Sequence, residues 1–547
     1  MASEGVDLVT FSVMALVFVI ATLALGWYGY RNTKRDTAAY LLGRNKTNAV
    51  IIALSYGATF LSASAVIGFG GQAAVHGATL MWLCFLNLLV GVVFAFAVFG
   101  GRTRRLGRKL HAGTFADLLG KAYKSKGIRI FTAVLIIAMM PIYCAAVLKG
   151  GVNSLAVITG LDYDVMLISL SLIVAAYVVF GGVIAVMYND ALQAVIMFVG
   201  MVVIFVVTIS AVGLDGFERL SDLYISGQLE QIKVLPGANG WVEFADFGSA
   251  EWLTVVTTFL LGVGIGCLTQ PQHAVRFMSA KDDKTLNRSM AIGAVFILVI
   301  VGSAYTCGTL CNLYFFDEHE HLSAIQYVTS GTDFVIPTYI VEVFRSITFG
   351  DMFVSLFLVS LICASISTIS GLMHTIGSAG GYDLYSSFKM WRARNSEEKT
   401  SVRVNRIVTL VMMVLVVLYC YWMPSDIIAK ATSVFMGVTA AALLPTYAHA
   451  LFSKNPCRPA ALVSIVAGSV TYAFWALFIN SGTSIFLPVC EMLTGNNVLF
   501  DGLIQYVDAL VVSLPMSIAA MLISLFVFRA RESAAVSEPA PAAPVSE

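Results

Sequence analysis

Long apolar runs recur along almost the whole chain and are separated by short polar segments. Crossing a hydrocarbon core of about 30 Å takes roughly 20 apolar residues in a helix. On that template the sequence predicts an all-α polytopic membrane protein with about 13 transmembrane helices. The helices are expected over residues 8–28, 48–74, 78–100, 128–158, 163–186, 189–213, 250–276, 288–315, 351–384, 404–424, 426–453, 459–480 and 506–529.

Glycines and polar residues interrupt the apolar pattern in two of these helices, over residues 55–71 and 262–273. In lipid, non-helical backbone is tolerated only where it lines a protein or water cavity, because unsatisfied backbone groups are costly there. The two interrupted helices lie five spans apart. This spacing predicts a core of five-plus-five inverted repeats, each opening with a discontinuous helix. The alternative is that the small residues merely allow close helix packing.

Basic residues fall in alternate loops. The basic segments are 29–47, 101–129, 276–288, 389–406, 454–458 and 529–531, whereas 214–249, 316–350 and 481–505 hold few basic and many acidic residues. Lys and Arg are retained on the cytoplasmic side, so this bias predicts an N-terminus outside and a C-terminus in the cytoplasm. Residues 1–530 are expected to form one transmembrane domain. The Ala-, Pro- and Ser-rich tail, 531–547, is expected to be disordered and cytoplasmic.

Composition narrows the function. Of the 547 residues, 58% are hydrophobic and 12% are charged, against about a quarter charged in soluble proteins. The net charge of +1 gives no reason to expect nucleic acid, and the nine cysteines have no metal-site or disulfide spacing. The chain contains no GxxxxGK[ST] loop and no nucleophile–base set, so neither ATP-driven transport by this chain alone nor an enzyme is expected. The expected partners are the lipid bilayer and a small solute, with no obligatory protein partner.

Hydroxyl groups cluster in the ninth predicted helix, at Ser367, Thr368 and Ser370. Ser and Thr hydroxyls in helices usually donate hydrogen bonds to the carbonyls of the preceding turn. This cluster holds more hydroxyls than that local pairing explains. Hydroxyl and carbonyl oxygens are neutral, hard ligands that suit a weakly bound alkali cation. By contrast, the acidic and His-containing run 317–321 is expected to be an exposed outer loop rather than a metal site.

Three segments together resemble the sodium/solute symporter family. Residues 180–193 are similar to its GG-x-x-AV-x-WTD-x-x-Q segment, residues 270–278 to its GQPH-x-x-x-RF segment, and residues 364–370 to its hydroxyl-rich segment. The resemblance covers about residues 8–530. It implies sodium-coupled symport of a small organic solute by alternating access in the plasma membrane. We expect this solute to be a carboxylate or an amino acid.

The resemblance also implies sodium ligands. By motif, the main site corresponds to the carbonyls of Ala58, Leu61 and Ala364 and the hydroxyls of Ser367 and Thr368. Asp190 and Ser370 match a second sodium site of some members, but Gly371 stands where those members have serine. The other interpretation of Asp190 is an N-terminal helix cap.

Solute contacts are expected near the two interruptions. The candidate residues are Ser62, Tyr143, Lys149, Thr269 and Gln270. Lys149 lies in mid-span, where a lysine must face a cavity or a partner. It can bind a solute carboxylate, form an internal ion pair such as one with Asp190, or act in coupling. Val263 and Cys267 stand where proline symporters have aromatic residues.

Two rival functions remain open at the level of sequence. One is a proton-coupled transporter on the same scaffold with Lys149 as the titrating group. The other is a transport-dead membrane sensor.

Overall fold

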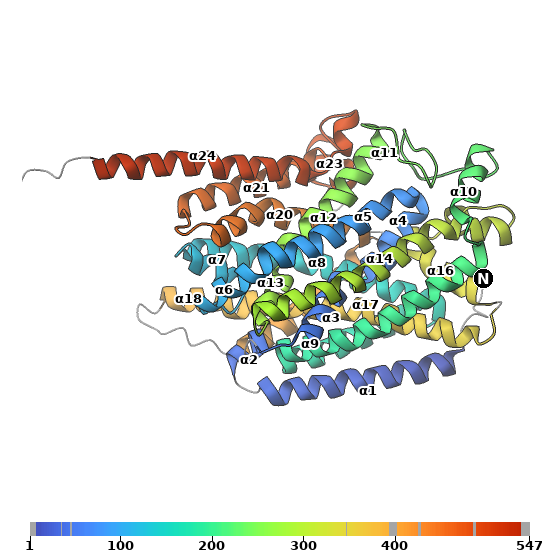
Figure 1. Ribbon diagram of the computed structural model, residues 1–547, viewed down its shortest axis with the longest axis horizontal. Helices are drawn as coiled ribbons and strands as arrows, with labels where there is room; N and C mark the ends of the chain where they lie inside the picture. Colours follow the sequence, from blue (N-terminus) through green and yellow to red (C-terminus); the bar gives the residue numbers. More distant parts are fainter. Residues whose placement is uncertain are drawn as a thin grey trace, which may run out of the picture.

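A computed structural model describes residues 7–33, 36–43, 46–345, 347–392, 402–424, 428–484 and 488–537. Within these ranges the regular secondary structure is helical, apart from one β-bridge that joins Thr47 to Ala280. Eleven helices of this described part are long and apolar enough to cross a membrane. In Figure 1 they lie side by side, with α1 along one edge of the bundle and α24 along the other. The predicted all-α polytopic membrane fold is confirmed.

The long helices have the following bounds in chain order. They are α1 (Leu8–Thr33), α3 (Ala49–Phe60), α8 (Lys126–Thr159), α9 (Tyr163–Val212), α14 (Asp283–Glu318), α17 (Gly350–Ser378), α19 (Val402–Trp422), α20 (Ile428–Phe452), α21 (Arg458–Phe478) and α24 (Ala509–Ser537). Shorter pieces extend them. These are η2 (Ser64–Gly68) with α4 (Phe69–His76), α5 (Met81–Leu86) with η4 (Asn87–Gly100) and α6 (Gly101–Lys109), η5 (Thr254–Leu261) with α12 (Gly262–Gly266) and η6 (Cys267–Thr269), α13 (Pro271–Ser279), and η8 (Ala379–Leu384) with α18 (Tyr385–Arg392).

Further short helices lie at the two ends of the bundle. They are α2 (Thr37–Leu42), η3 (Gly77–Leu80), α7 (Phe115–Ala122), α10 (Gly216–Ile225), α11 (Ala250–Leu253), α15 (Ala324–Tyr327), η7 (Thr332–Phe334), α16 (Val335–Arg345), α22 (Ser481–Ser484), α23 (Val489–Thr494) and η9 (Leu503–Tyr506). The end formed by α6, α7 and the first turns of α8 and α14 is called the basic end below, because it carries Arg108, Lys126 and Lys284. The opposite end carries α10 and α16 (Figure 1), and α15 packs on α16.

Some predicted spans run into one another. The helix α9 contains the predicted spans 163–186 and 189–213, and its one break, at Gly182 (φ 59°), lies inside the first of them. A Cβ at this glycine would lie 2.7 Å from the ring of Tyr40, so the break needs both the left-handed backbone and the missing side chain. The helical run from Ser64 to Lys109 bends at Gly77 (φ 70°). The inverted-repeat relation between the two sets of five spans stays a prediction.

Both predicted interruptions are confirmed as breaks in the helical backbone. The helix α3 ends at Phe60, Leu61 has φ −92° and ψ 78°, and a helical conformation resumes one residue before Ser64. The second break lies at Gln270, with φ −69° and ψ 119°. Gln270 precedes Pro271, and the residue before a proline avoids the helical region. Pro271 then opens α13 at the position where its missing N–H costs nothing.

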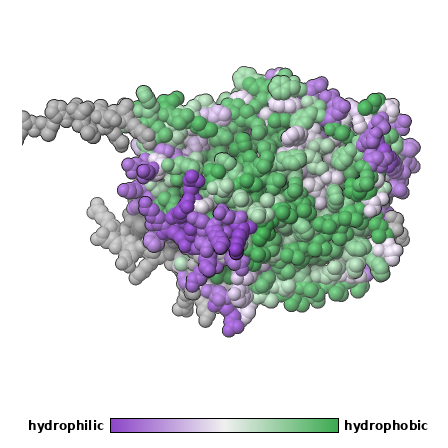
Figure 2. Space-filling model, in the orientation of Figure 1, coloured by the Kyte–Doolittle hydropathy of each residue, from purple (hydrophilic) through white to green (hydrophobic). Residues whose placement is uncertain are grey.

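Packing places the broken helices at the centre of the bundle. The helix α9 packs against α1, α3, α14 and α17, while α21 and α24 pack on each other and on α20 at the periphery. Figure 2 shows an apolar face along the bundle with hydrophilic residues gathered at its two ends, as a membrane-spanning protein requires. The helix α24 continues to Ser537, so the predicted disordered tail begins inside a helix, and residues 538–547 lie outside the described part.

Candidate functional site

The hydroxyl-rich middle of α17 faces the break after α3. Ser367 Oγ donates to the carbonyl oxygens of Ala58 at 2.9 Å and Ala364 at 3.2 Å. Thr368 Oγ1 donates to the carbonyl oxygen of Thr59 at 3.3 Å, two residues before Leu61. All of the five predicted sodium ligands are buried. Carbonyls released by a helix break, together with neutral hydroxyls, form the type of oxygen cluster that coordinates a transported alkali cation.

A buried ion pair between α9 and α13 lies beside the same stretches of α3 and α17. Asp190 Oδ2 accepts hydrogen bonds from Arg276 Nη2 at 2.8 Å, Ser55 Oγ at 2.7 Å and Thr59 Oγ1 at 3.2 Å. Ser370 Oγ donates to the other carboxylate oxygen, Oδ1, at 3.3 Å. Because two buried charges are stable together only when paired and hydrogen-bonded, Arg276 and Asp190 tie α13 to α9 across the core. The sequence analysis counted Arg276 within the basic segment 276–288, but its side chain is buried in the core, where an arginine needs a partner.

The structure also decides the alternative interpretation of Asp190. This residue lies inside α9, well beyond the break at Gly182, so the N-terminal cap interpretation is wrong. The predicted second-sodium pair, Asp190 and Ser370, is brought together. A Cβ on Gly371 would lie 2.8 Å from Thr59 Cγ2 and 3.1 Å from Arg276 Nη2. The missing side chain at this position therefore leaves room for the guanidinium of Arg276.

A second group of hydroxyls marks the start of η2. Tyr143 OH of α8 lies 3.2 Å from Ser62 Oγ and 3.5 Å from Ser64 Oγ, and the two serines are hydrogen-bonded to each other. The ring of Phe435 in α20 stacks on Tyr143 with centroids 5.1 Å apart. These groups form a polar cluster with an aromatic wall at the first break.

The second break carries its own polar group. Gln270 Nε2 donates to the carbonyl oxygen of Gly266 at 2.9 Å and to Thr439 Oγ1 at 3.0 Å. Thr269 Oγ1 donates to Gly266 at 3.4 Å. Thr439 lies one turn after Phe435, so a single face of α20 contacts both breaks. The sequence analysis missed this face of α20. The sequence contained one signal for it, namely Thr439 at helical spacing from the aromatic Phe435 within an apolar run.

Lys149 stands apart from these groups. Its ammonium donates to the carbonyl oxygen of Met423, which follows the last turn of α19. A cation is favourable at that position, because the carbonyl end of a helix carries partial negative charge. Asp190 pairs with Arg276 instead. The structure therefore brings together Ser62 with Tyr143 and Thr269 with Gln270, but not Lys149 with either pair.

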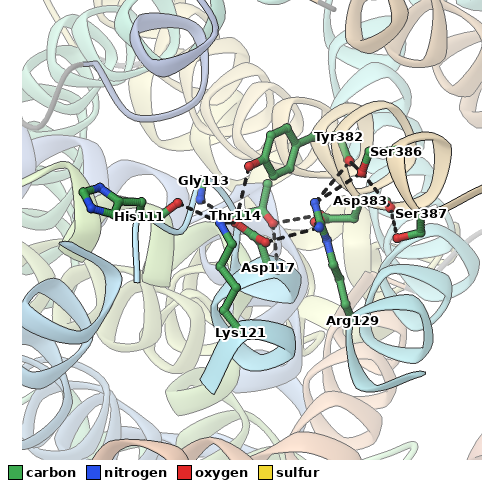
Figure 3. Close-up of polar contacts among 10 residues, drawn as sticks. All are labelled: His111, Gly113, Thr114, Asp117, Lys121, Arg129, Tyr382, Asp383, Ser386 and Ser387. Atoms are coloured by element: carbon green, nitrogen blue, oxygen red, sulfur yellow. Dashed lines mark hydrogen bonds and ion pairs between the residues drawn. The ribbon is translucent and has the colours of Figure 1, made fainter. Parts of the chain in front are cut away.

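A buried ionic network closes the basic end (Figure 3). Arg129, in the first turn of α8, donates from Nε to Asp383 Oδ1 at 2.9 Å and pairs with Asp117 Oδ1 at 3.4 Å. Thr114 Oγ1 donates to Asp383 Oδ2 at 2.8 Å, and Lys121 Nζ donates to Asp117 Oδ2 at 2.7 Å. Both carboxylates are fully buried. The network joins α7, α8 and η8, and α7 in turn packs on α13 and α20.

Close backbone packing closes the opposite end. A Cβ on Gly71 of α4 would lie 2.0 Å from the carbonyl oxygen of Thr332, so η7 rests directly on α4. With both ends closed, the side chains of Ser62, Tyr143 and Gln270 are at most 1% exposed.

Within the run 317–321, Asp317 pairs with Arg219 at 2.9 Å. The described residues contain no group of three or more ligands suited to a metal ion.

The model of the sodium:solute symporter family matches residues 40–468, and the chain belongs to that family. The osmoregulated proline transporter OpuE of Bacillus subtilis (strain 168) is 26% identical over 482 residues, covering 88% of this chain and 90% of that protein. Sodium/proline symporter 2 of Staphylococcus saprophyticus is 24% identical, covering 86% and 87%.

One solved structure is similar to this chain in fold. A substrate-bound outward-open sodium-coupled sialic acid symporter aligns with a TM-score of 0.73 at 16% identity, covering 95% of this chain and 98% of that one. Membership of the sodium:solute symporter family makes the chain a multi-pass membrane transporter of the sodium-coupled symport class and not an enzyme. The predicted co-transported ion, sodium, is confirmed at the level of the family.

The ion pair between Arg276 and Asp190 yields a stability prediction. Arg276→Gln leaves a buried carboxylate without its partner, which is expected to cost about 3–5 kcal/mol and to lower the melting temperature strongly. Adding Asp190→Asn removes the orphaned charge and should restore part of that loss. The exposed pair of Arg219 provides the control, because Arg219→Gln should cost about 0–1 kcal/mol. Equal melting temperatures for Arg276→Gln and Arg219→Gln would contradict the assignment.

Proposed function

We propose that this symporter carries a small amino acid or a related monocarboxylate into the cell together with sodium. The observation that supports the solute class is the hydroxyl cluster of Ser62, Ser64 and Tyr143 at the start of η2. This start is also the N-terminal end of the half-helix that continues into α4. A half-helix N-terminus inside a transporter favours the carboxylate of a solute.

The aromatic wall supports an amino group on the same solute. A cation over the face of a tyrosine or phenylalanine ring is attracted by the ring's electron density. The stacked rings of Tyr143 and Phe435 lie beside the serines that would hold the carboxylate. Two of the relatives are proline transporters by name, which makes L-proline the first solute to test. Val263 and Cys267 nevertheless leave the site without the aromatic residues expected there for proline, so related amino acids belong in the same test.

Sodium is assigned to the cluster of Ala58, Leu61, Ala364, Ser367 and Thr368. Hydroxyl hydrogens on Ser367 and Thr368 can turn away from the carbonyls that they now contact, so that all of these oxygens face one ion. Asp190 already has a permanent counter-charge in Arg276. We therefore assign the coupling ion to the first cluster and not to the pair of Asp190 and Ser370.

The two closures fit an alternating-access cycle. We place the basic end in the cytoplasm of a plasma membrane, with the N-terminus outside, because the concentration of Lys and Arg at one end follows the positive-inside rule. The network of Arg129, Asp117 and Asp383 then closes the path to the cytoplasm. The contact of η7 with α4 closes the path to the outside. Sodium and solute bind while the second contact is open, and opening of the first network releases them.

The proton-coupled alternative depends on Lys149 being the titrating group. Its ammonium instead donates a hydrogen bond to the Met423 carbonyl at the end of α19. This position favours a structural role for Lys149. Of the predicted solute contacts, Lys149 has the least support from the structure.

A solute panel tests the proposed substrate class. Purified protein should melt at a higher temperature with L-proline or a related amino acid in sodium, but not in choline. A ligand at a hundred times its dissociation constant adds about 2.7 kcal/mol to the state that it binds. The panel includes monocarboxylates and sugars as well as amino acids. Stabilisation by a sugar alone, or by an amino acid equally in choline, would contradict the proposal.

The sodium site has a matched pair of variants on one helix. Thr368→Ala removes a hydroxyl ligand and should raise the sodium concentration needed for half-maximal stabilisation by about tenfold to a hundredfold, since a bond to a charged partner contributes roughly 1.5–3 kcal/mol. Thr375→Ala should leave it unchanged, because the Thr375 hydroxyl donates to its own helix at the Gly371 carbonyl, at 2.8 Å. Identical sodium titrations for both variants would rule out the assignment.

A further inference from the structure

An apolar hollow opens on the flank of the bundle that faces lipid. It has a volume of about 540 Å³ and lies between α3, α9 and α14. Its lining includes Leu54, Val195, Val199, Ile292 and Val295, and every lining residue is apolar. Val195 is 52% exposed and Val295 is 60% exposed, so the hollow is open to the surroundings of the protein. In a bilayer, a hollow of this chemistry is filled by hydrocarbon.

Three basic side chains stand at the basic end of this hollow. Arg288 precedes Ile292 by one turn and Val295 by two on the same face of α14. Lys284 lies one further turn back, and Lys46 directly precedes the first turns of α3. All three side chains are exposed, and none forms an ion pair within the described part of the chain.

Backbone contacts hold Lys46 beside α14. The N–H of Thr47 donates to the carbonyl of Ser279 at 3.2 Å, and the N–H of Lys281 donates to the carbonyl of Thr47 at 3.3 Å. Ser289 Oγ donates to the carbonyl of Ala49 at 2.9 Å. These bonds fix the start of α3 against the first turns of α14, so the basic side chains border both walls of the hollow.

The neighbouring carboxylates are already engaged. Asp282 accepts from the N–H of Thr285 at 2.7 Å as the cap of α14. Asp283 accepts from Arg104 Nε at 2.8 Å and from Arg105 Nη1 at 3.1 Å. Figure 2 shows the resulting hydrophilic patch at the edge of the apolar face. Because Lys46, Lys284 and Arg288 form no ion pair within the described part of the chain, the patch keeps a surplus of cations at the end of the hollow.

The distance between the basic side chains and the hollow matches the distance between the phosphate and the acyl chain of a phospholipid. Seven residues separate Arg288 from Val295, which is about 10 Å along a helix. A phosphate headgroup at the interface and an acyl chain reaching inward span such a distance. We infer that this groove binds an anionic phospholipid, whose phosphate contacts Lys46, Lys284 and Arg288 and whose acyl chain occupies the hollow.

Such a lipid would contact the helix that carries the sodium carbonyls. Phe296 lines the hollow and also packs on Gly57, where an added Cβ would lie 2.4 Å from the Phe296 ring. Gly57 directly precedes Ala58. The bound acyl chain therefore braces α3 through Phe296, and this consequence rests on the proposed sodium site, whereas lipid binding itself does not.

Thermal stability of the purified full chain in neutral detergent measures this binding without sodium or solute. Phosphatidylglycerol should stabilise the wild type at much lower concentration than phosphatidylcholine does. The double variant Lys284→Gln, Arg288→Gln should bind phosphatidylglycerol about thirtyfold more weakly, since each cation near an anionic lipid contributes about fivefold. The matched double variant Lys124→Gln, Lys126→Gln removes two exposed cations elsewhere at the basic end and should bind as the wild type does.

A second pair of variants tests the acyl-chain half of the groove. Val295→Phe fills the hollow and should weaken phosphatidylglycerol binding several-fold. Val411→Phe places the same ring at a 61% exposed position on α19, outside the groove, and should have no effect. Any of three results would overturn the inference. These are equal stabilisation by the two lipids, equal phosphatidylglycerol binding by the two charge variants, and full stabilisation by glycerol phosphate, which has no acyl chains. Because the readout needs neither sodium nor solute, failure here is separate from failure of the proposed transport.

Discussion

Two short stretches of non-helical backbone in the middle of the bundle govern the rest of the structure. Polar backbone groups released from a helix cannot remain unpaired in a medium without water. At the first break, hydroxyls of α17 and α8 surround Ala58 and Ser62. At the second, the side chain of Gln270 turns back to the Gly266 carbonyl and also reaches Thr439. The same polar groups that satisfy the breaks are the ones that can bind an ion and a solute.

The ion pair of Asp190 and Arg276 joins these two centres. Arg276 lies in the helix that follows the second break, and its guanidinium reaches Ser55 and Thr59 of the helix that precedes the first. The carboxylate between them also receives the hydroxyl of Ser370 from α17. A fixed charge pair at this point keeps the two broken helices in register, which is the geometry that a shared ion and solute site requires.

Most of the fold could be predicted from the sequence, because hydropathy and length determine membrane spans and because glycine, proline and polar residues mark where helices break. The positions of the breaks near Leu61 and Gln270 followed from such local signals. The partner of Asp190 did not, since it lies far away in sequence and depends on how α9 and α13 pack. Lys149 was a candidate for solute binding, an ion pair or coupling because its charge in mid-span needs a partner, but charge alone does not determine which way a helix face points.

Sodium-driven uptake into vesicles tests the central claim most directly. The full chain is reconstituted in vesicles, and labelled L-proline and the other amino acids of the panel are followed with an inward sodium gradient, an inward proton gradient, or neither. The account predicts that an amino acid accumulates above its external concentration only with the sodium gradient. Accumulation that persists without sodium and collapses with the proton gradient would contradict it.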